Sequence, residues 1–110
     1  MSLLALAAAF AAPAAALGQV DGFSLINKSG AALSGVPLRR IGSDEWLPLP
    51  VAPGAGANVR APFASPDCAF DLRATVAGGD QVTWRGINLC DVKSVTLNRD
   101  RAGRSWVEYD

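Results

Sequence analysis

Residues 68–90 read CAFDLRATVAGGDQVTWRGINLC, and the pattern of this segment decides the fold. Apolar and polar side chains alternate in its first half, which puts the apolar ones on one side of an extended chain, as in a half-buried strand. Glycines then separate this half from a second run that is rich in valine, threonine and tryptophan. The segment therefore predicts a β-hairpin with one face in the core. That face carries Phe70, Leu72, Ala74, Val76, Val82 and Trp84.

The parity of the apolar residues restricts the register of this hairpin. Val82 and Trp84 lie at even positions, like the apolar residues of the first strand, so even positions must face even positions. A three-residue turn, Gly78-Gly79-Asp80, meets this condition. It would place Val76 opposite Val82 and Trp84 opposite an alanine.

The cysteines of the chain, Cys68 and Cys90, stand at the two ends of the hairpin. In the register above they face each other across adjacent strands, at a separation that a disulfide can bridge. The apolar residues after Gly86 have the opposite parity to Trp84. This change predicts a bulge at Gly86 that turns the strand over and displaces Cys90 by about one position. We expect the disulfide to form in either geometry.

Past the N-terminal stretch, short extended segments alternate with turn residues at a spacing of about ten residues, which is typical of a β-sandwich or barrel. The strands expected outside the hairpin cover residues 22–26, 36–41, 57–60, 93–98 and 105–109, with a short extended piece at 46–51. We predict an all-β fold: a small, disulfide-closed β-sandwich of immunoglobulin-like architecture.

The N-terminal stretch differs in composition from the rest of the chain. Residues 2–18, SLLALAAAFAAPAAALG, carry no charge and end in small residues, as a signal peptide does. The run is shorter than the roughly 20 strongly apolar residues that a spanning helix needs. We predict a signal peptide over 1–18, cleaved after Ala16 or Gly18, and a single domain over 19–110. A buried alanine-rich helix is the alternative interpretation of this run.

These features together predict where the protein acts. A leader of this kind directs export, and disulfides persist in the oxidising compartments outside the cytoplasm. No cysteine follows the leader directly, so we expect no lipid anchor. We predict a periplasmic or secreted monomer without stable membrane insertion after signal cleavage.

Composition argues against several classes of function. Ten Lys and Arg balance ten Asp and Glu, so no overall positive field favours nucleic acid. Histidine, the commonest metal ligand and general base, does not occur. Neither Lys28 nor Lys93 stands in an S-x-x-K sequence, and nothing places the carboxylates of Asp71 and Asp91 around a cleft. We predict a protein that is not an enzyme and takes no cofactor or metal.

A pair of arginines on the polar face of the hairpin is the first candidate binding site. In the expected register Arg73 faces Arg85 across the strands, and Asp71 lies two residues along on the same face. Two facing guanidinium groups repel each other unless a carboxylate or a bound anion lies between them. Either Asp71 neutralises the pair, or the pair binds a phosphate, a sulfate or a partner's carboxylate.

The turn that contains Asp44, Glu45 and Trp46 is the second candidate, as a contact loop. Two adjacent carboxylates fall short of the roughly six to eight oxygens that calcium takes, so we expect no calcium site. We expect instead that Asp44 caps local amides and that Trp46 packs over the edge of the core. A sugar platform formed by Trp46 and Trp106 is an alternative, because Trp84 has core parity and cannot join it.

Five short motifs follow one another along the chain. They read INKSG at 26–30, GSDEW at 42–46, CAFDLR at 68–73, WRGINLC at 84–90 and VTL at 95–97. With these motifs, the chain from Phe23 to Leu97 resembles a group of small exported bacterial β-rich proteins to which no activity is assigned. The resemblance implies export, a disulfide and a β-fold, and it implies no activity.

We therefore expect a non-catalytic binding or envelope-interaction module, whose partner is an unidentified envelope protein or a glycan. The alternative is an inhibitor or immunity-type protein that blocks an exported hydrolase. In that case a loop such as 42–46 would insert into the partner.

Export can be tested directly. Expressed in a bacterial host with its own N-terminus, the protein should be recovered from the periplasm or the medium. N-terminal sequencing should give Leu17 or Gln19 as the first residue, because the small residues before them fit signal peptidase. Recovery of the full-length chain from the cytoplasm, with both thiols open to alkylation, would contradict both the export and the disulfide.

Overall fold

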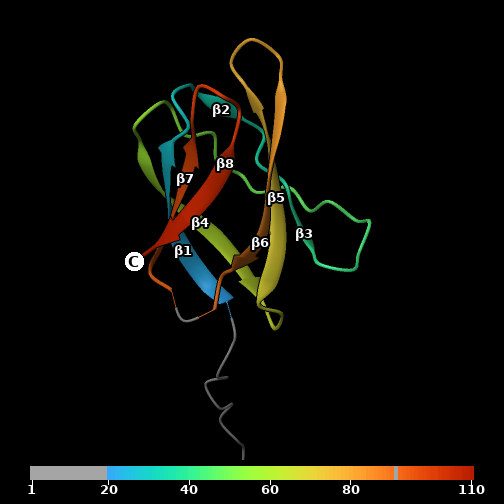
Figure 1. Cartoon of the computed structure of the whole chain (residues 1–110). Helices are drawn as coiled ribbons and strands as arrows, with labels where there is room; N and C mark the ends of the chain where they lie inside the picture. Colours follow the sequence, from blue (N-terminus) through green and yellow to red (C-terminus); the bar gives the residue numbers. More distant parts are fainter. Residues whose placement is uncertain (1–19, 91) are drawn as a thin grey trace, which may run out of the picture.

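The computed structural model describes residues 20–90 and 92–110, which fold into two packed β-sheets (Figure 1). No helix occurs in these residues. The predicted all-β, two-sheet fold is confirmed, whereas the predicted signal peptide lies outside the described residues. The strands are β1 (Val20–Lys28), β2 (Leu33–Ser34), β3 (Leu38–Arg40), β4 (Asn58–Ser65), β5 (Ala69–Val76), β6 (Gln81–Asn88), β7 (Ser94–Arg99) and β8 (Ser105–Tyr109).

The first sheet, sheet A, has the strand order β4-β1-β7-β8. β1 pairs antiparallel with β4 and parallel with β7, and β7 pairs antiparallel with β8. After the irregularity at Gly22, the buried side chains of β1 are those of its odd-numbered residues, and in β7 the odd-numbered Val95 and Leu97 are fully buried. The fully buried residues of these two strands accordingly include Phe23, Leu25, Val95 and Leu97.

The second sheet, sheet B, is built around β5. β6 pairs with one edge of β5, while β2 and β3 pair with different parts of the other edge. β2 and β3 are thus two pieces of one edge segment, interrupted at residues 35–37. Pro37 lies at this interruption, where its missing N–H costs no ladder bond, and its carbonyl accepts the N–H of Arg73 at 3.0 Å.

The hairpin β5–β6 keeps the expected parity but differs in register by two positions. The turn is closed by Val76 and Asp80, whose backbones are joined by a 2.7 Å hydrogen bond, and not by residues 77 and 81. Both Gly78 and Gly79 have φ above +100°, so they occupy the last two positions of the three-residue loop, where only glycine is unstrained. Trp84 consequently faces Leu72 rather than an alanine.

The bulge predicted at Gly86 is confirmed. The pairing shifts between Phe70 and Leu72, and Gly86 has φ +67° there. Trp84 and Ile87 both reach the core as a result, being 1% and 0% exposed. The shift also moves Cys90 one position past the residue opposite Cys68.

The predicted disulfide between Cys68 and Cys90 is confirmed despite this offset. The two Cα atoms are 5.1 Å apart, within the usual range for a bridge. The bridge joins the chain before β5 to the chain after β6, and it closes the base of the hairpin.

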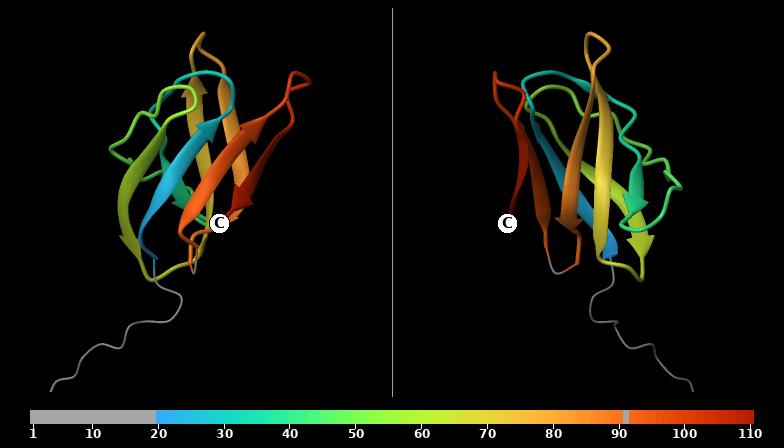
Figure 2. Two further views of the ribbon diagram at one scale, coloured as in Figure 1. Left: turned by 90° about the vertical axis from the view of Figure 1, so that its left-hand side faces the viewer. Right: turned by 45° about the vertical axis from the view of Figure 1, so that its right-hand side comes forward.

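Along one side of the sandwich, β6 of sheet B lies beside the β7–β8 pair of sheet A (Figure 2), and three hydrogen bonds join them. The indole N–H of Trp84 donates to the carbonyl of Asn98 at 2.9 Å. The N–H of Asn88 donates to the Tyr109 hydroxyl at 2.9 Å, and the Ser105 hydroxyl donates to the carbonyl of Thr83 at 3.2 Å. A buried Trp needs such a partner, and here that partner also joins the two sheets.

A fully buried asparagine holds together the loops at the end of β1. The Nδ2 of Asn27 donates to the carbonyls of Ala31, Pro53 and Gly54 at 2.8–3.1 Å. Its Oδ1 accepts the backbone N–H and the hydroxyl of Ser29. A buried amide is tolerated only when it is hydrogen-bonded, and this one connects two loops that are far apart in sequence.

β8 covers the expected residues 105–109, whereas the other remaining strands differ in extent from those expected. β2 was not predicted, because two residues are too few to show the alternation of apolar and polar side chains that marks a strand. β4 extends through Pro62 to Ser65. An irregularity in its pairing sets Pro62 and Phe63 opposite Gly22, and at this point the ladder does not require the N–H that proline lacks. The extended piece expected at 46–51 forms a single bridge, between Leu47 and Leu38. No helix long and apolar enough to cross a membrane occurs in the described parts of the chain.

The disulfide should contribute measurably to stability. Replacing both Cys68 and Cys90 by Ala should lower the free energy of unfolding by about 2–5 kcal/mol, because the open chain has more conformations in the unfolded state. Urea denaturation of the two proteins measures the difference. A reductant should destabilise the wild type but leave the double variant unchanged, and equal unfolding midpoints for all samples would contradict a stabilising disulfide.

Candidate functional site

The outward face of sheet B gathers arginine side chains around one carboxylate and one indole ring. Odd-numbered residues of β5 point outward, which brings Asp71 and Arg73 to this face, and Arg39 joins them because it pairs with Asp71. We call this surface the Arg–Trp face. It consists of Arg39, Trp46, Asp71, Arg73 and Arg85.

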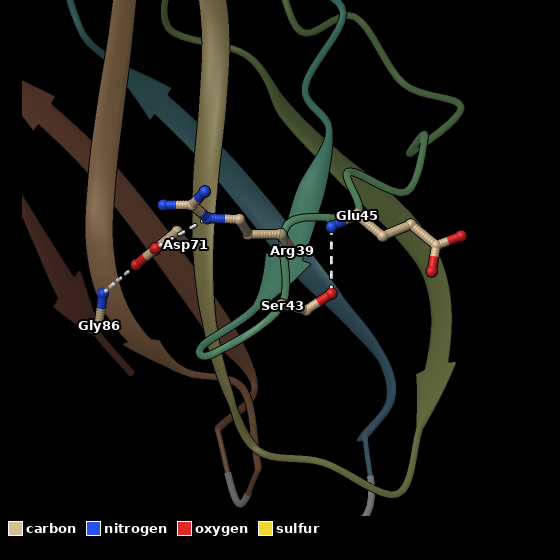
Figure 3. A network of polar contacts seen from close by, with 5 residues as sticks. All are labelled: Arg39, Ser43, Glu45, Asp71 and Gly86. Carbon is tan, nitrogen blue, oxygen red and sulfur yellow. Dashed lines mark hydrogen bonds and ion pairs between the residues drawn. The ribbon is translucent and has the colours of Figure 1, made fainter.

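Asp71 is the organising group of this face and is 7% exposed. Its Oδ2 accepts the Nε–H of Arg39 at 3.2 Å, and its Oδ1 accepts the N–H of Gly86 at 3.0 Å (Figure 3). One carboxylate therefore fastens the edge strand β3 to the bulge in β6, across the central strand β5. Charge-assisted hydrogen bonds of this kind are about twice as strong as neutral ones.

The expected opposition of Arg73 and Arg85 is wrong. Arg73 faces Thr83, because the hairpin turn closes one residue earlier on each strand than expected, which shifts the pairing by two positions. Asp71 forms its ion pair with Arg39 and not with either of the two expected arginines. Arg39 itself was missed: the alternation at 38–40 would place it outward, but only the pairing of β3 with β5 brings it to Asp71.

Trp46 lies against two of the arginines. The Cζ of Arg73 is 4.2 Å from the centroid of the Trp46 ring, and the Cζ of Arg39 is 4.7 Å from it. Cation–π contacts of this kind contribute about 0.5–1 kcal/mol each at exposed sites and more where water is excluded. These contacts favour one arrangement of the ring and the two guanidinium groups.

The loop that carries Trp46 is held at both ends. At its far end, Leu47 exchanges backbone hydrogen bonds with Leu38 at 2.7 and 2.9 Å. At its near end, the Ser43 hydroxyl accepts the N–H of Glu45 at 3.1 Å (Figure 3). The expected cap is therefore formed by Ser43 and not by Asp44, whose exposed carboxylate has no hydrogen-bond partner among the described residues.

The face carries more positive charge than its carboxylate can neutralise. Arg85 is exposed, and neither Arg85 nor Arg73 forms an ion pair with a carboxylate in the described chain. Asp71 is already engaged by Arg39. Two guanidinium groups are thus available to an external anion.

A small recess adjoins Arg73 in the gap between β2 and β3. Its volume is about 150 Å³. Apart from Arg73, its polar walls come from Ser34, Thr75 and Gln81, whose side chains have no hydrogen-bond partner in the described part of the chain. Hydroxyl and amide groups beside a guanidinium can donate hydrogen bonds to a carboxylate.

The tryptophans do not converge on one platform. Trp84 lies in the core, Trp46 is packed against guanidinium groups, and Trp106 is exposed on sheet A. Among the described residues, no cluster of His, Cys, Asp or Glu could hold a metal ion. Asp91, half of the formal carboxylate pair, lies outside the described residues.

Comparisons with known proteins show the fold and nothing further. No family model and no curated protein sequence matches the chain. Among solved structures, the chain is similar to a protein from Eubacterium rectale determined by NMR. The TM-score is 0.56 at 17% identity, and the match covers 82% of this chain and 87% of the other.

Asp71 substitutions should separate its two contacts. Asp71→Asn keeps an oxygen for the N–H of Gly86 but loses the ion pair with Arg39, and we expect it to cost about 1 kcal/mol of unfolding free energy. Asp71→Ala leaves both partners unsatisfied and should cost about 2–4 kcal/mol. Chemical denaturation measures both values.

Asp44→Asn is the matched control, since that carboxylate is exposed and unpartnered among the described residues, and it should change stability by less than about 0.5 kcal/mol. Equal effects of Asp71→Ala and Asp44→Asn would contradict the organising role of Asp71.

Proposed function

We propose that this protein is an exported, non-catalytic binding module that uses the Arg–Trp face to bind an acidic surface of a partner protein. The observation that carries the proposal is the Trp46 ring in contact with Arg39 and Arg73, with an exposed Arg85 next to the Gly86 that donates to Asp71. Tryptophan and arginine are the residue types that most often dominate binding energy at protein interfaces.

Pre-organisation supports the same conclusion. Binding usually costs about 0.5–1.5 kcal/mol for each flexible side chain that it immobilises. Here Arg39 is already held by Asp71 and by the Trp46 ring, and Arg73 is held by that ring. A partner would therefore meet a surface whose long side chains are largely ordered in advance.

Two features indicate the chemistry of the partner. Unpaired guanidinium groups favour carboxylates, which they bind through two parallel hydrogen bonds. On the same loop as Trp46, the exposed side chains of Ile41 and Leu47 add apolar contact area. A protein surface that carries Asp or Glu beside apolar residues fits both, and the recess beside Arg73 would receive one of the carboxylates.

The proposed location outside the cytoplasm rests on two features. The Cys68–Cys90 disulfide fits an oxidising compartment, and the apolar leader is of the type that directs export. The partner is accordingly expected in the periplasm, in the cell envelope or in the medium.

Inhibition of an exported hydrolase is the second candidate function. Inhibitor loops act best when they are rigid before binding. The loop at 41–47 is held by the Leu38–Leu47 bridge and by Trp46, and it presents the exposed carboxylates of Asp44 and Glu45. In this case the partner's contact residues would be basic rather than acidic.

A peptide titration tests the charge preference of the face. At low salt, a hexa-glutamate peptide should shift the amide NMR signals of Arg73, Thr75 and Arg85, and a hexa-glutamine peptide should not. Arg73→Ala or Arg85→Ala should weaken the binding of hexa-glutamate roughly tenfold, the effect of one lost charge-assisted contact. Salt should weaken it as well, because exposed charges are screened.

Lys93→Ala is the control, because Lys93 is exposed and lies outside the face. Equal responses to the two peptides, or to Lys93→Ala and Arg85→Ala, would contradict the proposal. In a pull-down from envelope extract, a partner enzyme captured through Asp44 and Glu45 but not through Arg85 would establish the inhibitor instead. Retention on a glycan that does not depend on Arg73 would contradict both.

A further inference from the structure

A second group of arginines lies at the far end of sheet A, where two parallel strands end side by side. β1 and β7 are the parallel pair among the described strands, and Lys28 pairs with Asn98 at their ends. Beyond this point the chain leaves β1 toward β2 in sheet B, whereas it leaves β7 toward β8 at the edge of sheet A (Figure 2).

Loops that leave neighbouring parallel strands in opposite directions open a crevice between them. This geometry places ligand sites at the carboxyl ends of strands in open parallel sheets. A groove of about 340 Å³ lies at this place in the sandwich, and it is lined by Ser29, Gly30, Arg99, Asp100 and Arg101. We call it the strand-end crevice.

The single carboxylate of the strand-end crevice is occupied by its own turn. The Oδ1 of Asp100 accepts the N–H groups of Ala102 and Arg104, both at 2.9 Å. Its Oδ2 accepts the Nε–H of Arg104 at 2.7 Å. The backbone N–H of Arg104 is the main cause that lowers the pKa of Asp100, so the group stays ionised and bonded to the turn.

The donors of the crevice have no such partners. Neither Arg99 nor Arg101 forms an ion pair or a side-chain hydrogen bond within the described chain. The N–H of Gly30 also has no acceptor among the described residues. Gly30 has φ +91°, a conformation in which loop amides can turn toward a bound anion.

We propose that the strand-end crevice binds a phosphate group. Arg99, Arg101 and Gly30 line one groove, and their two guanidinium groups and backbone N–H match the charge and the several acceptor oxygens of a tetrahedral oxyanion. The phosphate can come from a soluble phosphomonoester or from a phospholipid headgroup. The crevice belongs to sheet A, so this site does not depend on the Arg–Trp face of sheet B.

Titration with inorganic phosphate tests the site in the disulfide-bonded protein. At constant ionic strength, with chloride as the exchanged anion, phosphate should shift the amide NMR signals of Gly30, Asp100 and Arg101. Arg101→Ala should raise the dissociation constant roughly tenfold, and Arg99→Ala should act in the same direction. Arg101→Lys should recover only part of the affinity, because an ammonium group lacks the planar fork of guanidinium.

Arg85→Ala serves as the matched control, since it removes an exposed arginine from the other sheet and should leave the phosphate titration unchanged. This variant also separates the two proposals, because it should weaken only the hexa-glutamate binding.

Sedimentation with vesicles identifies the source of the phosphate. Retention on phosphatidylglycerol vesicles but not on phosphatidylcholine vesicles, lost in Arg99→Ala and Arg101→Ala, indicates an anionic lipid headgroup. Phosphate-dependent shifts without vesicle retention indicate a soluble phosphomonoester. The proposal is overturned if neither phosphate nor vesicles give a response, or if the wild type, Arg99→Ala and Arg101→Ala respond alike.

Discussion

The bulge at Gly86 is the constraint on which much of sheet B depends. In a regular strand, Trp84 and Ile87 would lie on opposite faces. One of these large apolar side chains would then face water, at a cost of about 1.5–3 kcal/mol. The extra residue lets both enter the core. It also leaves the N–H of Gly86 without a ladder partner, and Asp71 accepts it. The same carboxylate then holds Arg39, so the bulge fixes the position of the edge strand and, through Arg39, contributes to the position of the indole ring above it.

Several polar residues of the sequence motifs form hydrogen bonds within the fold, so their side chains serve structure rather than ligand binding. Asn27 of the INKSG motif connects two loops by hydrogen bonds, and the side-chain oxygen of Asn88 in the WRGINLC motif accepts the N–H of Cys90. Ser43 of the GSDEW motif caps its own turn. The bonds of the buried Asn27 matter most in a small domain, because a buried polar group left unpaired would cost about 1–3 kcal/mol out of a total stability near 5–15 kcal/mol.

The zero net charge of the chain conceals two separate basic surfaces. The outward face of sheet B and the far end of sheet A each combine unpaired arginines with one carboxylate whose oxygens already accept hydrogen bonds. Asp71 and Asp100 differ in burial but act alike. Each pairs with one arginine, and the other arginines of its surface form no ion pair with it. Both proposed sites follow from this distribution of charge, which total composition does not reveal.

The sequence alone determined the β-fold, the inward face of the hairpin, the bulge at Gly86 and the pairing of the cysteines. Each of these follows from the strict two-residue period of a strand, which assigns every side chain to one face and exposes any change of parity. The tertiary structure decided which residues meet across strands. Moving the turn by one residue shifts the pairing by two positions and preserves all parities, so the sequence pattern could not distinguish Thr83 from Arg85 as the neighbour of Arg73. The contacts of Asp71 with Arg39 and of Trp46 with two arginines required the edge strand and a long loop to be placed against β5, and no local period encodes that placement.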